Sequence, residues 1–167
     1  MKKRTFLKLS SAVITGTMVS PLISWAQDEK LKNWAGNIEY STSRIQYPKT
    51  LEEVQELVKK NKKLKVLGTR HCFNTIADSK DDFISLGKFE YPVTLDKNSR
   101  KVTVGAGVRY GQLADFLQQE GFALHNLASL PHISIAGATA TATHGSGNKN
   151  GNLSSAVAGV ELVNAKG

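Results

Sequence analysis

The pattern of apolar residues along the chain predicts two amphipathic helices. One follows Thr50, because the apolar residues of LEEVQELV (51–58) recur at the spacing of a single helix face. Thr50 and Glu53 have the spacing of a capping box, which indicates where this helix begins. The other is YGQLADFLQQE (110–120), whose apolar side chains share one side and whose end is indicated by Gly121.

Short apolar runs between turn residues predict strands. The expected strands are LKVLG (64–68), FISL (83–86), TLD (94–96), KVTVGAG (101–107), FALHN (122–126) and VAGVELVN (157–164). TLD and KVTVGAG are expected to form a hairpin across KNSR, because Leu95 and Val102 belong to an alternating series of apolar residues. The pattern therefore predicts a fold of mixed α and β elements. The chain ends at NAKG, a turn signal directly after the last strand, so we expect a domain cut short at its C-terminus.

The first residues have the pattern of an export signal. Basic residues precede a modestly apolar run (9–24), and Ala26 offers a cleavage site after it. The run is too short and too interrupted for a membrane span, although an uncleaved anchor is the alternative. We predict a signal peptide at 1–26 and a periplasmic or extracellular protein. KRTFLK (3–8) also resembles a twin-arginine export signal with Lys in the first Arg position, and the ordinary secretion route is the rival interpretation.

Charge and cysteine content exclude several classes of protein. The 167 residues suggest one domain, and their formal charge of +8 is smaller without the basic leader. The densest basic cluster, KKNKK (59–63), ends a predicted helix, where cations are favoured by the helix dipole. No basic patch is interleaved with aromatic residues, so we expect no nucleic-acid partner. Cys72 is the only cysteine, which excludes an intrachain disulfide.

Two glycine-rich runs and one stretch of small residues are candidates for a ligand site. GAGVRYG (105–111) and GSGNKNG (145–151) miss the dinucleotide fingerprint, and no P-loop motif is present. Glycines at a strand-to-helix turn can nevertheless hold a pyrophosphate with backbone N–H groups, and with Gly68 these runs suggest a bound dinucleotide. SIAGATATATHGSG (134–147) allows close approach of its backbone, either to a ligand or to a packed neighbouring element.

The histidines do not predict a metal site. Their spacings are irregular, and no acidic residue lies between His125 and His144. His71 and Cys72 are a poor catalytic dyad, because neighbours in an extended loop point in opposite directions. We expect Cys72 to be a small buried residue.

LGTRHCFN (67–74) and ASLPHISIAGATATATHGSG (128–147) resemble the two FAD-contacting segments of the vanillyl-alcohol-oxidase (PCMH-type) flavoenzymes. They look most like those of alditol oxidases, with aldonolactone oxidases as the nearest relatives, and the similarity extends from Asn33 to the end. The resemblance implies an α+β fold of two α+β subdomains with FAD between them. It assigns residues 27–167 to an incomplete FAD-binding domain that lacks the substrate-binding domain.

The resemblance also implies which residues contact FAD. They are Val66, Leu67, Gly68, Thr69, Arg70, His71, Cys72, Ser129, Ser134, Gly137, Ala138, Thr139, Ala140 and His144. The loop 66–72 is expected to wrap the pyrophosphate, and His71 matches the position that bonds covalently to the flavin 8α carbon. A neutral imidazole suits that chemistry, and the alternative is a histidine merely hydrogen-bonded near the phosphates. Arg70 and Cys72 depart from the small residue and the serine that are usual at these positions.

The implied reaction is oxidation of a polyol. A hydride would pass from a carbinol carbon to flavin N5, and O2 would reoxidise the flavin and give H2O2. The alternatives are an aldonolactone oxidase, which acts on a sugar lactone, and a non-catalytic FAD-binding fragment. No catalytic acid or base is assigned, because the family carries these in the later domain, and we expect these 167 residues alone to be inactive. We expect no stable membrane partner.

Overall fold

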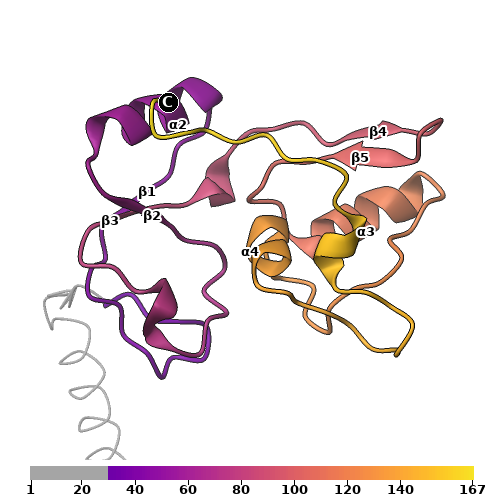
Figure 1. Ribbon diagram of the computed structural model, residues 1–167, viewed down its shortest axis with the longest axis horizontal. Helices are drawn as coiled ribbons and strands as arrows, with labels where there is room; N and C mark the ends of the chain where they lie inside the picture. Colours follow the sequence, from indigo (N-terminus) through magenta and orange to yellow (C-terminus); the bar gives the residue numbers. More distant parts are fainter. Residues whose placement is uncertain (1–29) are drawn as a thin grey trace, which may run out of the picture.

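The computed structural model describes residues 30–167, so the predicted leader at 1–26 lies outside the described residues. The chain forms two lobes that lie side by side (Figure 1). The first carries a helix and a parallel sheet, and the second carries two helices and a hairpin. The predicted mixture of α and β elements is confirmed. Among residues 30–167, no helix is long and apolar enough to cross a membrane.

The sheet of the first lobe is parallel, with the strand order β1-β3-β2. Its strands are β1 (Ile45–Gln46), β2 (Leu64–Val66) and β3 (Asp82–Ile84). Phe83 on the central strand pairs in register with Ile45 on one side and Lys65 on the other, and its side chain is fully buried. Because the strands are parallel, the loops that follow them all leave from the same edge of the sheet.

Helix α2 (Leu51–Lys60) connects β1 to β2 and begins where the sequence predicts. The hydroxyl of Thr50 accepts a hydrogen bond from the backbone N–H of Glu53 at 3.3 Å. The Glu53 carboxylate in turn accepts from the backbone N–H of Lys49, one residue before the cap, at 2.6 Å. The reciprocal bonds satisfy donors that a helix start would otherwise leave unpaired.

The second lobe contains the predicted hairpin and the second predicted helix. Strands β4 (Thr94–Asp96) and β5 (Lys101–Thr103) are antiparallel, with Leu95 opposite Val102. Helix α3 (Tyr110–Gln119) is followed by Gly121 in the left-handed region, at φ +78°. A short helix α4 (Ile135–Ala140) packs beside the 3-10 turn η3 (Leu153–Ala156). A core cluster of this lobe contains Tyr110, Ile133, Ala138 and Leu153.

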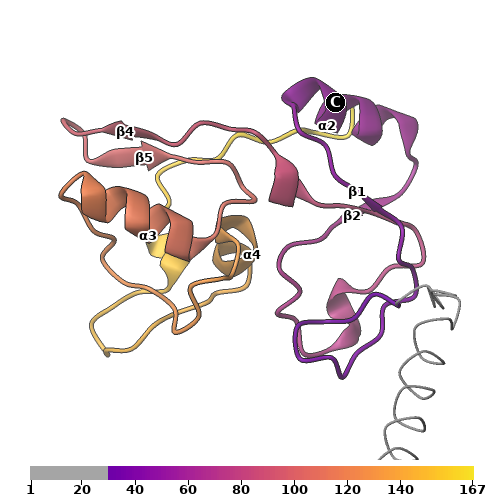
Figure 2. The same cartoon turned by 180° about the vertical axis from the view of Figure 1, so that it is seen from behind.

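Two of the predicted strands are wrong. Within residues 30–167, neither 122–126 nor 157–164 is assigned as a strand, because no neighbouring strand offers the hydrogen bonds that a ladder requires. The segment 157–164 instead runs from the second lobe back towards α2, which both views show (Figures 1 and 2). Its apolar side chains are exposed, with Leu162 at 80%. The predicted turn after it forms, and Gly167 donates to the Asn164 carbonyl at 2.9 Å.

Candidate cofactor-binding site

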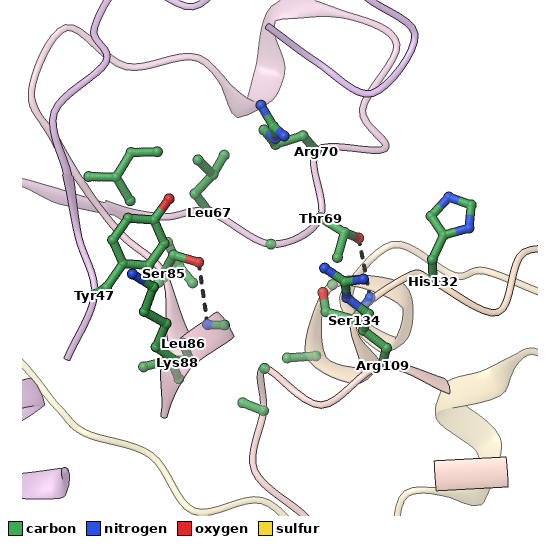
Figure 3. Close-up of a pocket in the computed structure, with 18 of the residues that line it drawn as sticks. Tyr47, Leu67, Thr69, Arg70, Ser85, Leu86, Lys88, Arg109, His132 and Ser134 are labelled. Carbon is green, nitrogen blue, oxygen red and sulfur yellow. Dashed lines mark hydrogen bonds between the residues drawn. The ribbon is translucent and has the colours of Figure 1, made fainter. Parts of the chain in front are cut away.

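A cleft of about 980 Å³ separates the two lobes at the carboxyl edge of the parallel sheet (Figure 3). Its first wall is built from the residues that directly follow the strands. Tyr47 follows β1, residues 67–70 follow β2, and residues 85–88, which include the turn η2 (Leu86–Lys88), follow β3. The carboxyl edge of a parallel sheet is where α/β proteins generally bind ligands. The sheet topology therefore places this wall where a ligand site is expected.

The opposite wall comes from the second lobe. It is formed by Ala106, Gly107, Arg109 and Gln112 near the start of α3, and by His132, Ser134 and residues of α4. The backbone N–H of Ser134 donates to the Thr69 hydroxyl at 3.2 Å, a bond drawn in Figure 3. Ser134 is buried, so this bond joins the two walls at a place shielded from water.

Close backbone contacts explain the small residues at this junction. A Cβ on Gly68 or on Gly137 would lie 2.8 Å from the Ser134 hydroxyl oxygen, closer than real Cβ contacts allow. A Cβ on Gly107 would lie 1.9 Å from the carbonyl oxygen of Leu86 on the other lobe. The sequence left two explanations open for the stretch 134–147: packing against a neighbouring element is confirmed, and close approach to a ligand stays a prediction. Ala138 packs in the core, whereas Ala136, Gly137, Ala140 and Thr141 line the cleft.

The cleft has a positive lining. Within residues 30–167, the cations on its walls are Arg70, Lys88 and Arg109, and none of the lining residues is Asp or Glu. The Lys88 ammonium lies 4.7 Å from the centre of the Tyr47 ring, which holds it at the wall. Cations on concave walls without opposing carboxylates favour an anionic ligand such as a pyrophosphate. The volume is also suitable for a large cofactor.

Arg70 sits in an unusual backbone conformation on the first wall. Its φ of +65° lies in the left-handed region, which costs a residue with a Cβ about 1 kcal/mol. Its guanidinium donates to the Lys32 carbonyl at 2.9 Å, and its own carbonyl accepts from the Trp34 N–H at 2.9 Å. The Asn33 side chain also donates to the Cys72 carbonyl at 3.1 Å. The segment before β1 thus fixes the strained loop.

His71 belongs to a stack of three rings at one end of the cleft. Its ring centre lies 4.8 Å from Trp34 and 4.6 Å from His132. Both ring nitrogens of His71 are buried and have no hydrogen-bond partner among residues 30–167. Burial lowers the pKa of the His71 imidazole below its ordinary value, and the neighbouring His132 lowers this pKa further. His71 is therefore held as a neutral imidazole with free lone-pair and N–H positions.

The structure brings together part of the site predicted from sequence. The predicted residues that line the cleft are Val66, Leu67, Gly68, Thr69, Arg70, Ser134, Gly137 and Ala140. The predicted residues that do not line it are His71, Cys72, Ser129, Ala138, Thr139 and His144. His71 is next to two residues that do, Trp34 and His132. Whether any of them contacts FAD stays a prediction.

The predicted residues outside the cleft have other partners. Ala138 is in the core, the Thr139 hydroxyl donates to the Ile135 carbonyl at 2.9 Å, and the exposed His144 ring lies 2.9 Å from the Gly145 carbonyl. Cys72 is half-buried rather than buried, with its thiol 3.1 Å from the Asn74 side-chain oxygen. That prediction was wrong because a polar neighbour draws the thiol towards the loop surface.

The sequence interpretation also missed lining residues. They include Trp34, Tyr47, Lys88, Arg109 and His132. Lys88 follows a predicted strand, so the rule that ligands bind at strand carboxyl ends could have found it. Trp34 gave no local signal, since its contact with His71 depends on how distant segments fold together.

Comparison with known proteins assigns the chain to a family. Residues 42–167 match the FAD binding domain family. The chain is 46% identical over 138 residues to an alditol oxidase from Streptomyces sp., covering 81% of the chain and 33% of that protein. It is 32% identical over 142 residues to the L-gulonolactone oxidase of Mus musculus, covering 83% of the chain and 32% of that protein. It is also 32% identical over 156 residues to the D-arabinono-1,4-lactone oxidase of Saccharomyces cerevisiae, covering 87% of the chain and 29% of that protein. The chain thus spans about a third of the length of the curated relatives it matches.

Among solved structures, the fold is similar to that of a cholesterol oxidase from B. sterolicum. The TM-score is 0.62 at 22% sequence identity, over 70% of this chain and 24% of that one. The α+β fold of the PCMH-type FAD-binding domain predicted from sequence is confirmed. The resemblance to alditol and aldonolactone oxidases is confirmed as well. The chain belongs to the FAD binding domain family.

Proposed function

We propose that the cleft between the lobes binds FAD. The observation that carries the proposal is the cationic lining, Arg70, Lys88 and Arg109, in a cleft of about 980 Å³ on a chain of this family. Arg70 and Arg109 stand on opposite walls and would both be available to a pyrophosphate. The glycines on both walls would let backbone N–H groups approach the same anion.

FAD titration of the purified chain tests this site. Loss of the Arg109 guanidinium in Arg109→Ala is expected to weaken FAD binding roughly tenfold or more, because hydrogen bonds to charged groups contribute about 1.5–3 kcal/mol. Lys97→Ala is the matched control, since Lys97 pairs with Glu120 away from the cleft. Equally weakened FAD binding in both variants, or no FAD binding by the wild type, would contradict the proposal that FAD binds in this cleft.

His71 is proposed as the covalent attachment point for FAD. An imidazole nitrogen of His71 would bond to the flavin 8α carbon, and the 8-methyl group and the imidazole would each lose a proton. The two electrons of that step would reduce the flavin, and O2 would take them with two protons to give H2O2. Two observations support this: the ring nitrogens of His71 have no partner within residues 30–167, and its pKa is lowered, which keeps a lone pair available.

The mass of acid-denatured protein tests the attachment. An added FAD mass in the wild type that is absent from His71→Ala would support it. Flavin released on denaturation, with no added mass, would show a noncovalent site and would leave the binding proposal intact.

The proposed reaction is the oxidation of a polyol (alditol) CH–OH group to an aldehyde with O2 as acceptor. Bound FAD would supply hydride acceptance, and this chain's residues would bind and orient it. The support is the 46% identity to an alditol oxidase, against 32% to the lactone oxidases. In a protein that carries the substrate-binding domain as well, peroxide release from a linear alditol but not from L-gulonolactone would favour this reaction. Peroxide release from L-gulonolactone but not from the alditol would favour the aldonolactone oxidase. If FAD is bound and neither compound gives peroxide, a non-catalytic FAD-binding domain would be favoured.

We further propose that residues 1–26 export the chain, leaving 27–167 as the FAD-binding domain. The support is the basic start, the apolar run and the cleavage site of the sequence. Arg4→Lys should block export if the twin-arginine route is used. Unchanged export of this variant would indicate the ordinary secretion route.

A further inference from the structure

Asn33 is a buried polar residue whose side chain holds two distant segments together. The residue is 4% exposed, and it is not among the residues that line the cleft. Its Nδ2 atom donates to the Cys72 carbonyl at 3.1 Å and to the Asn37 side-chain oxygen at 2.8 Å. Its Oδ1 atom accepts from the Ile38 backbone N–H at 3.0 Å. Both N–H groups and the oxygen of this amide are therefore paired.

The partners of the Asn33 side chain require an amide at this position. A backbone carbonyl such as that of Cys72 can only accept a hydrogen bond, and a backbone N–H such as that of Ile38 can only donate one. The side chain between them must donate on one side and accept on the other, which neither a carboxylate nor an aliphatic group can do. The bond to Cys72 joins residues 39 positions apart, so it fixes the packing of two segments rather than a local turn.

The bond to Cys72 is one of three that hold the loop on both sides of His71. The backbone N–H of Trp34 donates to the Arg70 carbonyl at 2.9 Å, and the Arg70 guanidinium donates to the Lys32 carbonyl at 2.9 Å. The Trp34 ring also packs against the His71 imidazole, with 4.8 Å between the ring centres. The loop is thus tied to the segment before β1 at the residue before His71 and at the residue after it.

Backbone strain in this loop explains why it needs such bonds. Arg70 has a φ of +65°, and a residue with a Cβ keeps that conformation only where its surroundings impose it. Residues 67–70 of the same loop line the cleft. If the bonds from Asn33 and Trp34 were lost, the loop would relax, and the backbone that it presents to a ligand would change.

We propose that Asn33 is a positioning residue of the cofactor site, which acts through the loop 67–72 without lining the cleft. Its amide keeps residues 67–70 facing the cleft and His71 at the end of it. This rests on the FAD binding proposed above. A loop that is ordered before the ligand arrives does not have to be ordered at the expense of binding energy, so Asn33 acts on FAD affinity.

FAD titration of the purified full chain, followed by flavin fluorescence, tests this role. Asn33→Asp keeps the shape and the acceptor of the side chain but removes both donors. It is expected to weaken FAD binding about tenfold, because the loop would then spend most of its time outside the binding conformation. Asn37→Asp is the matched control, since it introduces the same charge nearby and keeps the oxygen that accepts from Asn33. The FAD affinity of Asn37→Asp should match that of the wild type.

Two further variants separate positioning from charge and from general stability. Asn33→Ser introduces no charge and is too short to reach the Cys72 carbonyl, so it should weaken FAD binding as Asn33→Asp does. Thr50→Ala removes the hydroxyl that caps α2 and should lower Tm. Its FAD affinity should be unchanged, because the residues of α2 do not line the cleft.

An NMR titration checks the loop without FAD. Burial lowers the pKa of the His71 ring in the wild type, and this pKa should rise towards its ordinary value in Asn33→Ser and stay low in Thr50→Ala. Wild-type FAD affinity in both Asn33 variants, an equal loss of affinity in Asn37→Asp or Thr50→Ala, or an unchanged His71 pKa in Asn33→Ser would overturn the proposal. A wild type that binds no FAD would overturn the proposed function with it, whereas the other outcomes leave FAD binding in the cleft intact.

Discussion

Gly107 is a position where the backbones of the two lobes lie in close contact, and Gly107→Ala tests whether that contact defines the cleft. A Cβ there would lie 1.9 Å from the Leu86 carbonyl oxygen and 2.4 Å from its carbon. Both are backbone atoms, so no side chain can rotate away. The Leu86 turn would have to move by about 1 Å or more to restore ordinary contact.

The cost can be worked from the bonds at that turn. The Leu86 carbonyl oxygen, the atom that would be displaced, accepts the hydrogen bond from Phe89 N–H that closes the turn, at 3.1 Å. Overpacking costs about 1–3 kcal/mol and a broken backbone hydrogen bond about 1 kcal/mol. We therefore expect Gly107→Ala to lower the free energy of unfolding by about 3 kcal/mol, which corresponds to roughly 10 °C in Tm.

Thermal unfolding of the chain measures the effect, with two matched controls. Gly87→Ala adds a methyl group on the facing turn, where its nearest neighbour, the Ser85 hydroxyl, is at an ordinary 3.5 Å. Gly159→Ala adds one where nothing among residues 30–167 lies within 4 Å. Both should change Tm by less than about 3 °C, since an exposed Ala for Gly changes stability by under about 1 kcal/mol. A Gly107→Ala variant as stable as these controls would refute the close contact between the lobes.

Further predictions concern the loop after β2 and its surroundings. Arg70→Ala should be less stable to urea than Arg70→Gly by about 1 kcal/mol, because glycine tolerates a φ of +65°; equal midpoints would contradict the strain. Thr69→Val should lower the free energy of unfolding by about 1–3 kcal/mol, because the buried Ser134 N–H loses its acceptor. Thr69→Ser keeps a hydroxyl and should retain most of the wild-type stability. A Thr69→Val variant as stable as the wild type would mean that the bond is unimportant. Hydrogen bonds from Ser41 lower the pKa of Asp78, so their stabilisation is present above about pH 4 and lost below it. Asp78→Asn should therefore lower Tm at pH 6, and the difference in Tm should shrink as the pH falls below about 4; a Tm difference independent of pH would argue against the shift.

Local signals in the sequence were enough to predict the helices and the hairpin. Thr50 caps α2 with its own side chain, and the turn between β4 and β5 lies within one short segment. Strand β1 was missed, because two residues of mixed polarity carry no alternation and their partner, β3, is far away in sequence. The segment 157–164 has the alternation of a strand, but pairing is decided by what lies beside it.

The site was predicted from sequence on one wall better than on the other. Residues 66–70, which the resemblance predicts to contact FAD, all line the cleft, because that loop is a continuous segment. Arg109 and His132 complete the opposite wall only after the second lobe folds against the first. The same is true of Trp34, whose ring meets His71 through a contact between segments far apart in the chain. Contacts of this kind depend on the whole fold, and no local pattern encodes them.

Ser134 couples the width of the cleft to the packing of the protein. Its hydroxyl fills the space that Cβ atoms on Gly68 and Gly137 would need, and its N–H is bonded to Thr69. Substitutions at these residues should therefore change stability and ligand binding together. Arg109 is different, because its exposed side chain lines the cleft without packing in the core. A change there should weaken anion binding with little loss of stability, so it separates what the cleft binds from what holds the cleft together.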